Sequence, residues 1–184
     1  EISYNNYMNL HVSDVQLYNS LYDAMRVEYN NYSIMNFKNL DIKDNDEEAM
    51  RIRSNQSGSQ VKVELSNFVN NNQRYYYDGI VNIGDYDYTN GSVIFNNNNF
   101  IDTNPDHQNN NNFYYARVDA NGGSSDQIDM TSNYWGQLVT AEMDSLGSRA
   151  NISKIYDNWD SGSRSEVDYA SWLSSPMIRP VKVH

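Results

Sequence analysis

Two stretches of the chain align without a gap: YNNYMNLHVSDVQLYNSLYDAMRV, residues 4–27, and YNNYSIMNFKNLDIKDNDEEAMRI, residues 29–52. The offset between them is 25 residues. Apolar residues meet apolar residues along the alignment, as in the pairs Val12–Phe37, Leu17–Ile42 and Val27–Ile52. A register held over so many positions indicates an internal repeat, and periods of about 20 to 50 residues are typical of stacked-repeat folds.

The repeat continues with longer periods. Polar anchor residues recur at spacings of 25, 28, 32 and 34 residues, at Asp14, Asn39, Asn67, Asn99 and Asn133. Stacked coils place equivalent residues about 4.8 Å apart. We therefore expect these five side chains to form one structural ladder at a shared corner, bonded to the backbone of adjacent coils.

Each repeat consists of short alternating runs separated by Asn, Asp and Gly. Alternation places one residue inside and the next outside, as in a strand. The pattern predicts an all-β fold, a right-handed parallel β-helix (β-solenoid) of about five coils, with 1–184 as a single domain and 1–136 as its repeat coils. The residues expected to face inward are Val12, Leu17, Val27, Phe37, Ile42, Ile52, Leu65, Phe68, Ile83, Phe95, Phe100 and Val118.

The C-terminal third carries an ordered set of short motifs: Asn133-Tyr134-Trp135-Gly136, Ile155-Tyr156-Asp157, Val167-Asp168-Tyr169 and Trp172-Leu173. This order resembles the last coils of secreted bacterial and archaeal β-helix repeat proteins of the pectate-lyase-like superfamily. The resemblance implies a helical insert within 137–150 and a terminal coil or cap completing 137–184. It also implies an extracellular or cell-surface location. It implies no activity, because that superfamily holds lyases, hydrolases, epimerases, adhesins and surface-layer proteins.

Composition excludes several classes of function. The chain has no cysteine and a net charge of -11, so it offers no disulfide or thiolate site and repels nucleic acids. No apolar run approaches the roughly 20 residues of a membrane helix. Tyrosine is abundant, with 16 residues, which suits strands and binding surfaces.

Arginines recur on one expected outer strand face. Arg26, Arg51 and Arg117 occupy equivalent outward positions. Such a row could bind a carboxylated polysaccharide. The alternative is that these are solvated positions paired with Glu28 and Asp119. We expect no cofactor. The acidic run Asp44-x-Asp46-Glu47-Glu48 could contribute ligands to calcium, but it is not a full calcium-binding loop.

Aromatic residues gather in two expected inserted loops. One carries Tyr75, Tyr76 and Tyr77, and the other carries Tyr114 and Tyr115. Exposed aromatics bind sugars or form protein interfaces. Packing beneath their own loops is the alternative, and the sequence does not decide between the two.

The first coil is expected to have an open edge. By the 25-residue offset Ile2 is equivalent to Val27, so the chain begins inside a strand. An open strand edge invites pairing, either with upstream coils or with a neighbouring subunit, and unclosed head-to-tail contacts generate filaments. Two functions follow. The favoured one is a structural or adhesive surface protein, a sheath, surface-layer or filament subunit or a carbohydrate-binding stalk, without a catalytic centre. The other is a lyase or epimerase acting on acidic polysaccharide.

Overall fold

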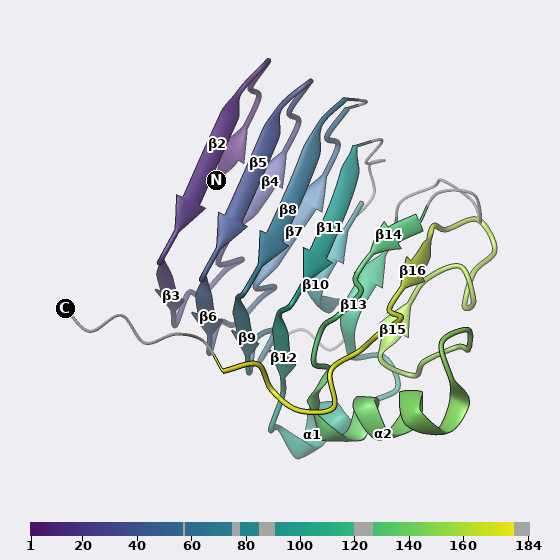
Figure 1. Cartoon of the computed structure of the whole chain (residues 1–184). Helices are drawn as coiled ribbons and strands as arrows, with labels where there is room; N and C mark the ends of the chain where they lie inside the picture. The colour runs from purple at the N-terminus through teal and green to yellow at the C-terminus, as the bar shows by residue number, and fades with distance from the viewer. Residues whose placement is uncertain (57, 75–77, 85–90, 120–126, 179–184) are drawn as a thin grey trace.

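The chain forms a parallel β-solenoid built from three stacked sheets. The computed structural model describes residues 1–56, 58–74, 78–84, 91–119 and 127–178 (Figure 1). Each of the first four coils contributes one strand to each sheet in turn, and the paired strands are parallel. Coil 1 is β1–β3, coil 2 is β4–β6, coil 3 is β7–β9 and coil 4 is β10–β12, and strands β13–β16 continue two of the three sheets.

The strands are short, as the sequence predicts. The β1 sheet holds β1 (Ile2–Ser3), β4 (Arg26–Glu28), β7 (Met50–Arg53), β10 (Gly79–Ile83), β13 (Tyr114–Val118) and β15 (Ile155–Tyr156). The β2 sheet holds β2 (Asn9–Ser13), β5 (Ile34–Lys38), β8 (Gln60–Glu64), β11 (Ser92–Asn96), β14 (Gln127–Asp129) and β16 (Glu166–Asp168). The β3 sheet holds β3 (Gln16–Tyr18), β6 (Asp41–Lys43), β9 (Asn67–Val69) and β12 (Asn99–Ile101).

The core is a set of apolar columns that run along the stack. One column is Ile2, Val27, Ile52, Ile83 and Val118, paired in register. Another ends in an aromatic stack, in which the Phe100 ring lies 4.9 Å from Phe68 and 4.8 Å from Trp135. Burying such columns is the main stabilising contribution of the fold, at about 25 cal/mol per Å².

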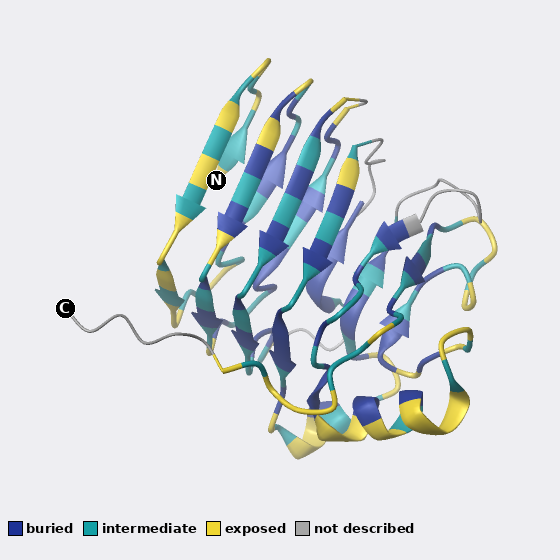
Figure 2. Cartoon of the chain, in the orientation of Figure 1, coloured by how far each residue is buried: buried dark blue, intermediate teal, exposed yellow. Residues whose placement is uncertain are grey.

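Most of the predicted core residues are buried. Nine of the twelve are at most 1% exposed: Val27, Phe37, Ile42, Ile52, Phe68, Ile83, Phe95, Phe100 and Val118. Val12 and Leu17 are half-buried, because they belong to coil 1 and are covered by a neighbouring coil on one side only (Figure 2).

Leu65 was wrongly predicted to face inward. It is half-buried and has φ 54°, which places it in the left-handed corner that Asn39 and Asn97 occupy in other coils. The reason is the true offset between coils 2 and 3, which pairs Ile42 with Phe68 and is therefore 26 residues. The spacing of 28 inferred from the anchor residues shifts this part of coil 3 by two positions.

The predicted helical insert is α2, Gly136–Leu146, which lies at one end of the solenoid (Figure 1). A second helix, α1 (Pro105–Gln108), was not predicted; Asn104 caps it by accepting a bond from the Asp106 N–H. The segment after β16 runs back along the β3 sheet, where Met177 exchanges two hydrogen bonds with the Asn99 side chain. In the described part of the chain no helix is long and apolar enough to span a membrane.

Candidate functional site

The outer face of the β1 sheet carries the predicted row of arginines. Strand register places Arg26 beside Arg51, Arg51 beside Asn82, and Asn82 beside Arg117. Tyr156 of β15 continues the row next to Arg117. The equivalence of the three arginines is therefore confirmed.

Carboxylates of the same chain neutralise the first two arginines. Arg26 Nε lies 2.5 Å from Asp23 Oδ2, and Arg51 Nε lies 3.4 Å from the same oxygen. Arg51 Nη2 also donates to Glu48 Oε1 at 2.8 Å, and the Asn82 side chain approaches that oxygen at 3.5 Å. The Asp23 side chain is fully buried and that of Glu48 nearly so. Each arginine is thus held by the buried acid three residues before it, and Arg51 also contacts the equivalent acid one repeat earlier.

Asp23 and Glu48 share a proton. Burial, the hydrogen bond to Asp23 and its charge raise the pKa of Glu48 to about 8, against the lowering effect of Arg51. Burial also raises the pKa of Asp23, but the bond from Glu48 and the charges of Arg51 and Arg26 outweigh it and bring the pKa below its usual value. At neutral pH the pair is therefore a carboxylic acid bonded to a carboxylate. The sequence contained the signal, because Asp23 and Glu48 are 25 residues apart.

The same acids are the best candidates for a metal site among the described residues. Carboxylate oxygens of Asp23, Glu47 and Glu48 lie within 4.8 Å of one another. Calcium favours six to eight oxygen ligands. Here two of the three acids already accept bonds from Arg26 and Arg51, so a cation would have to displace guanidinium groups. The arrangement suits a closed ion-pair network better than a cation.

Arg117 belongs to a second network. Its Nε lies 2.8 Å from Asp119 Oδ2, and Arg164 contacts the other oxygen of the same carboxylate. Both guanidinium groups lie over the Tyr156 ring, at 5.1 and 5.0 Å from its centre. Asp119 is thus the predicted partner of Arg117, whereas Glu28 pairs with Arg53 instead.

The predicted aromatic cluster is only partly within the described structure. Tyr75, Tyr76 and Tyr77 lie outside the described residues. Tyr114 and Tyr115 begin strand β13 instead of forming an inserted loop. Tyr115 is 3% exposed, and burial raises its pKa. Tyr114 is half-buried and packs against Tyr156, so neither presents an open ring face for a ligand.

The five residues of the predicted ladder do not share one corner. Four of them form two separate hydrogen-bonded pairs. Asn39 donates to Asp14 at 3.1 Å, and both have left-handed backbone. Asn99 donates to Asn67 at 2.8 Å, but these two begin strands β12 and β9. With the 26-residue offset Asn67 pairs with Asp41 and not with Asn39, so the single corner was wrong.

Asn133 belongs to a third, buried column. Its Oδ1 accepts bonds from the backbone N–H and the side chain of Asn98, at 2.8 and 3.1 Å. Its side chain donates to Phe95 O at 2.7 Å. A similar column, Asn5–Asn30–Asn55, lies at the turn from the β1 sheet to the β2 sheet; Asn30 and Asn55 are buried and Asn5 is half-buried.

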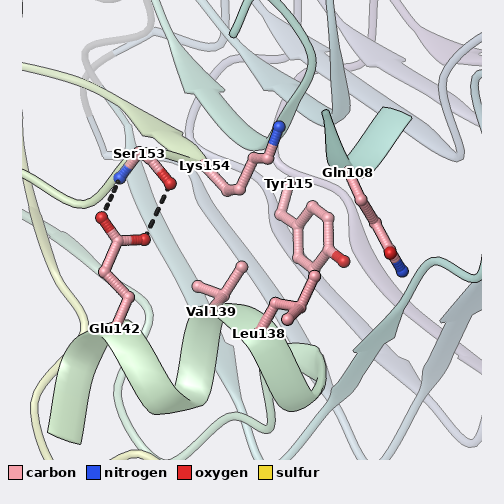
Figure 3. A pocket seen from close by; sticks show the side chains of 7 residues that line it. All are labelled: Gln108, Tyr115, Leu138, Val139, Glu142, Ser153 and Lys154. Carbon is pink, nitrogen blue, oxygen red and sulfur yellow. Dashed lines mark hydrogen bonds between the residues drawn. The ribbon is translucent and has the colours of Figure 1, made fainter. Parts of the chain in front are cut away.

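A small pocket of about 130 Å³ lies between α2 and the end of the solenoid. Figure 3 shows Tyr115, Leu138 and Val139 on its apolar side. Its polar residues bond within the chain: Glu142 accepts two bonds from Ser153 at 2.9 and 2.7 Å, and Lys154 donates to carbonyl groups of His107 and Asn110. The Ser153 bonds fix α2 to the segment before β15, and the Lys154 bonds fix that segment to the end of α1 and the residues after it. With its polar groups engaged in this way, the pocket is a weak candidate for a ligand.

A second surface was not recognised as a site from the sequence: the tyrosine corner, residues 4–7 and 29–32. Tyr4 stacks on Tyr29 with ring centres 4.8 Å apart, and Tyr7 stacks on Tyr32 at 5.3 Å. All four have φ between 46° and 57°. Left-handed backbone costs a bulky residue about 1–2 kcal/mol. The repeated Tyr-Asn-Asn-Tyr motif was visible in the sequence. It did not predict left-handed backbone at the tyrosines, because bulky residues rarely adopt it.

Comparison with known proteins found no match for the chain. No family model matches the chain, and no curated protein or solved structure is similar to it. The parallel β-solenoid is therefore assigned from the structure alone.

Proposed function

We propose that the chain is a structural or adhesive module of the cell surface, related to the β-helix repeat proteins of the pectate-lyase-like superfamily, and that it extends by stacking a further coil on coil 1. The observation that carries the proposal is the edge of coil 1. Strands β1, β2 and β3 each lie at the end of a sheet. Their apolar residues, including Leu10, Val12 and Leu17, are covered by coil 2 on one side only.

The backbone of β2 supports pairing at this edge. Met8 O accepts a bond from Ile34 N at 2.8 Å, and Asp14 N donates to Lys38 O at 3.1 Å. Because successive residues of a strand direct their peptide groups to opposite neighbours, Asn9, His11 and Ser13 direct theirs away from coil 2. A strand edge of this kind is a template for another strand.

The asparagine column supplies a matching side chain. Asn55 Oδ1 accepts from the Asn30 backbone and side chain, and Asn30 Oδ1 accepts from Asn5 in the same way, at 3.2 and 3.0 Å. By this repeat, the Oδ1 of Asn5 is the acceptor for a further coil. That coil comes either from a longer chain or from a second molecule.

The alternative, a lyase or epimerase for acidic polysaccharide, has less support. Its candidate residues Arg26, Arg51 and Arg117 are engaged by acids of the same chain, and the charge of the molecule is -11. We expect no eliminative cleavage of pectate or alginate, with or without calcium. Cleavage that disappears in Arg51→Ala would favour the enzyme instead.

Self-association through coil 1 tests the proposal. His11→Pro removes a backbone donor directed away from coil 2, whereas His11→Ala keeps it. We expect wild type and His11→Ala to associate as concentration rises, measured by light scattering after size exclusion, and His11→Pro to remain monomeric. Equal association of both variants would contradict pairing at this edge.

A further inference from the structure

The tyrosine corner is not required by the fold. In coil 3, Ser54 follows Arg53 at the position that Tyr29 holds after Glu28, and it adopts the same left-handed backbone. Gly58 lies directly beneath Tyr32, where an added Cβ would come within 2.6 Å of the ring. Since a serine and a glycine serve at this corner one coil further on, four strained tyrosines need another explanation.

The edges of the stacked rings are exposed at the side of the solenoid, in addition to the ring faces of Tyr4 and Tyr7 at the open end. Tyr4 and Tyr7 are 72% and 78% exposed. Tyr32 remains 57% exposed although coil 1 already covers coil 2 and the Tyr7 ring is stacked on it. A further coil on coil 1 would therefore leave the flank of these rings open, and their exposure is not explained by coil stacking.

An amide column lies between the two aromatic columns. Asn6 and Asn31 are bridged in the backbone, and the Asn31 side chain donates to Asn6 Oδ1 at 2.9 Å. Asn6 is exposed, so its amide offers donors and acceptors to solvent. Within residues 4–7 and 29–32 every side chain is Tyr or Asn, with none charged at neutral pH, although the whole chain carries a charge of -11.

We propose that the tyrosine corner binds a neutral polysaccharide along the axis of the solenoid. Because the rings are stacked on one another, they present their edges and hydroxyl groups along this axis. These hydroxyl groups and the amides between them can donate to and accept from the hydroxyl groups of a neutral sugar chain. A polyanion would be repelled by the acidic molecule, and a polycation would find no carboxylate in this corner. The inference deepens the adhesive form of the proposed function and rests on it.

The test is binding of the whole chain to immobilised neutral polysaccharides (cellulose, β-1,3-glucan, mannan and chitin) with pectate and alginate as acidic comparators. Calorimetry with an oligomer of the best neutral glycan then gives the affinity. We expect the double variant Tyr7→Asn/Tyr32→Asn to weaken binding at least about tenfold. Its unfolding midpoint should hold or rise, because asparagine tolerates left-handed backbone better than tyrosine. Tyr22→Asn, which removes a ring of coil 1 that is 66% exposed and outside the corner, should bind like wild type.

Asn6→Ala is a second variant that leaves the tyrosine backbone unchanged, and we expect it to weaken binding severalfold. The proposal is wrong if no neutral polysaccharide binds, if only the acidic ones bind, or if the double variant and Tyr22→Asn lose affinity equally. It is also wrong if the double variant abolishes self-association instead, since the corner would then be a protein interface. His11→Pro should bind glycan normally, so coil pairing and glycan binding can fail independently.

Discussion

The buried asparagine column gives the sharpest prediction of stability. Asn55 accepts bonds from Asn30 N–H and Asn30 Nδ2, at 3.2 and 2.9 Å, and donates to Val27 O at 2.9 Å. All three residues are fully buried. Asn55→Ala deprives three buried polar groups of this partner, and each such group costs about 1–3 kcal/mol. Taking the lower end, because neighbours relax, the free energy of unfolding should fall by about 3 kcal/mol.

Thermal and urea denaturation followed by circular dichroism measure this loss. For a chain of this size the midpoint should fall by roughly 6–12 °C, at about 2–4 °C per kcal/mol. Asn31→Ala is the matched control, because its bond to Asn6 is exposed and its loss should cost less than about 0.5 kcal/mol. Equal effects of Asn55→Ala and Asn31→Ala would refute the view that buried amides hold the coils together.

Three further changes probe the core, a corner and the acid pair. Phe100→Ala, which removes a buried ring stacked on Phe68 and Trp135, should cost about 3–5 kcal/mol in urea denaturation. Leu65→Asn should stabilise the chain by about 1 kcal/mol, since asparagine suits its φ of 54°; a loss of stability would mean that the side chain packs usefully. Folded Glu48, with a pKa of about 8, keeps a proton that the unfolded chain releases above about 4.5. Stability should therefore fall as pH rises between these values, and Glu48→Gln should flatten the slope of unfolding free energy against pH.

The repeat was readable from sequence because its chemistry is local. Apolar residues return at every second position of each short strand, and the ungapped match between coils 1 and 2 fixes which of them stack. This is why Val27, Ile52 and Phe37 were placed correctly. Beyond coil 2 the offsets change, and asparagine is common enough for a wrong match to look acceptable. That ambiguity produced the errors at Leu65 and in the single ladder.

The candidate sites were less predictable than the core. The repeat correctly aligned Arg26 with Arg51, and the 25-residue spacing of Asp23 and Glu48 was visible, but sequence could not say that these acids would be buried and bonded to the arginines. Such pairing depends on burial and on distances between coils, which composition does not report. The prediction that Tyr114 and Tyr115 lie in an inserted loop was wrong for a related reason. Aromatic residues suit buried strands as well as exposed loops.

Hydrogen exchange at the edge of coil 1 tests the central claim most directly. The comparison is between the chain and a longer chain in which residues 4–28 are repeated once ahead of residue 4. We predict that the backbone amides of the original Asn9, His11 and Ser13 exchange rapidly in dilute wild type and become protected in the longer chain, because a further coil pairs with them. Rapid exchange of these amides in both proteins would show that coil 1 does not accept another coil, and would contradict the account.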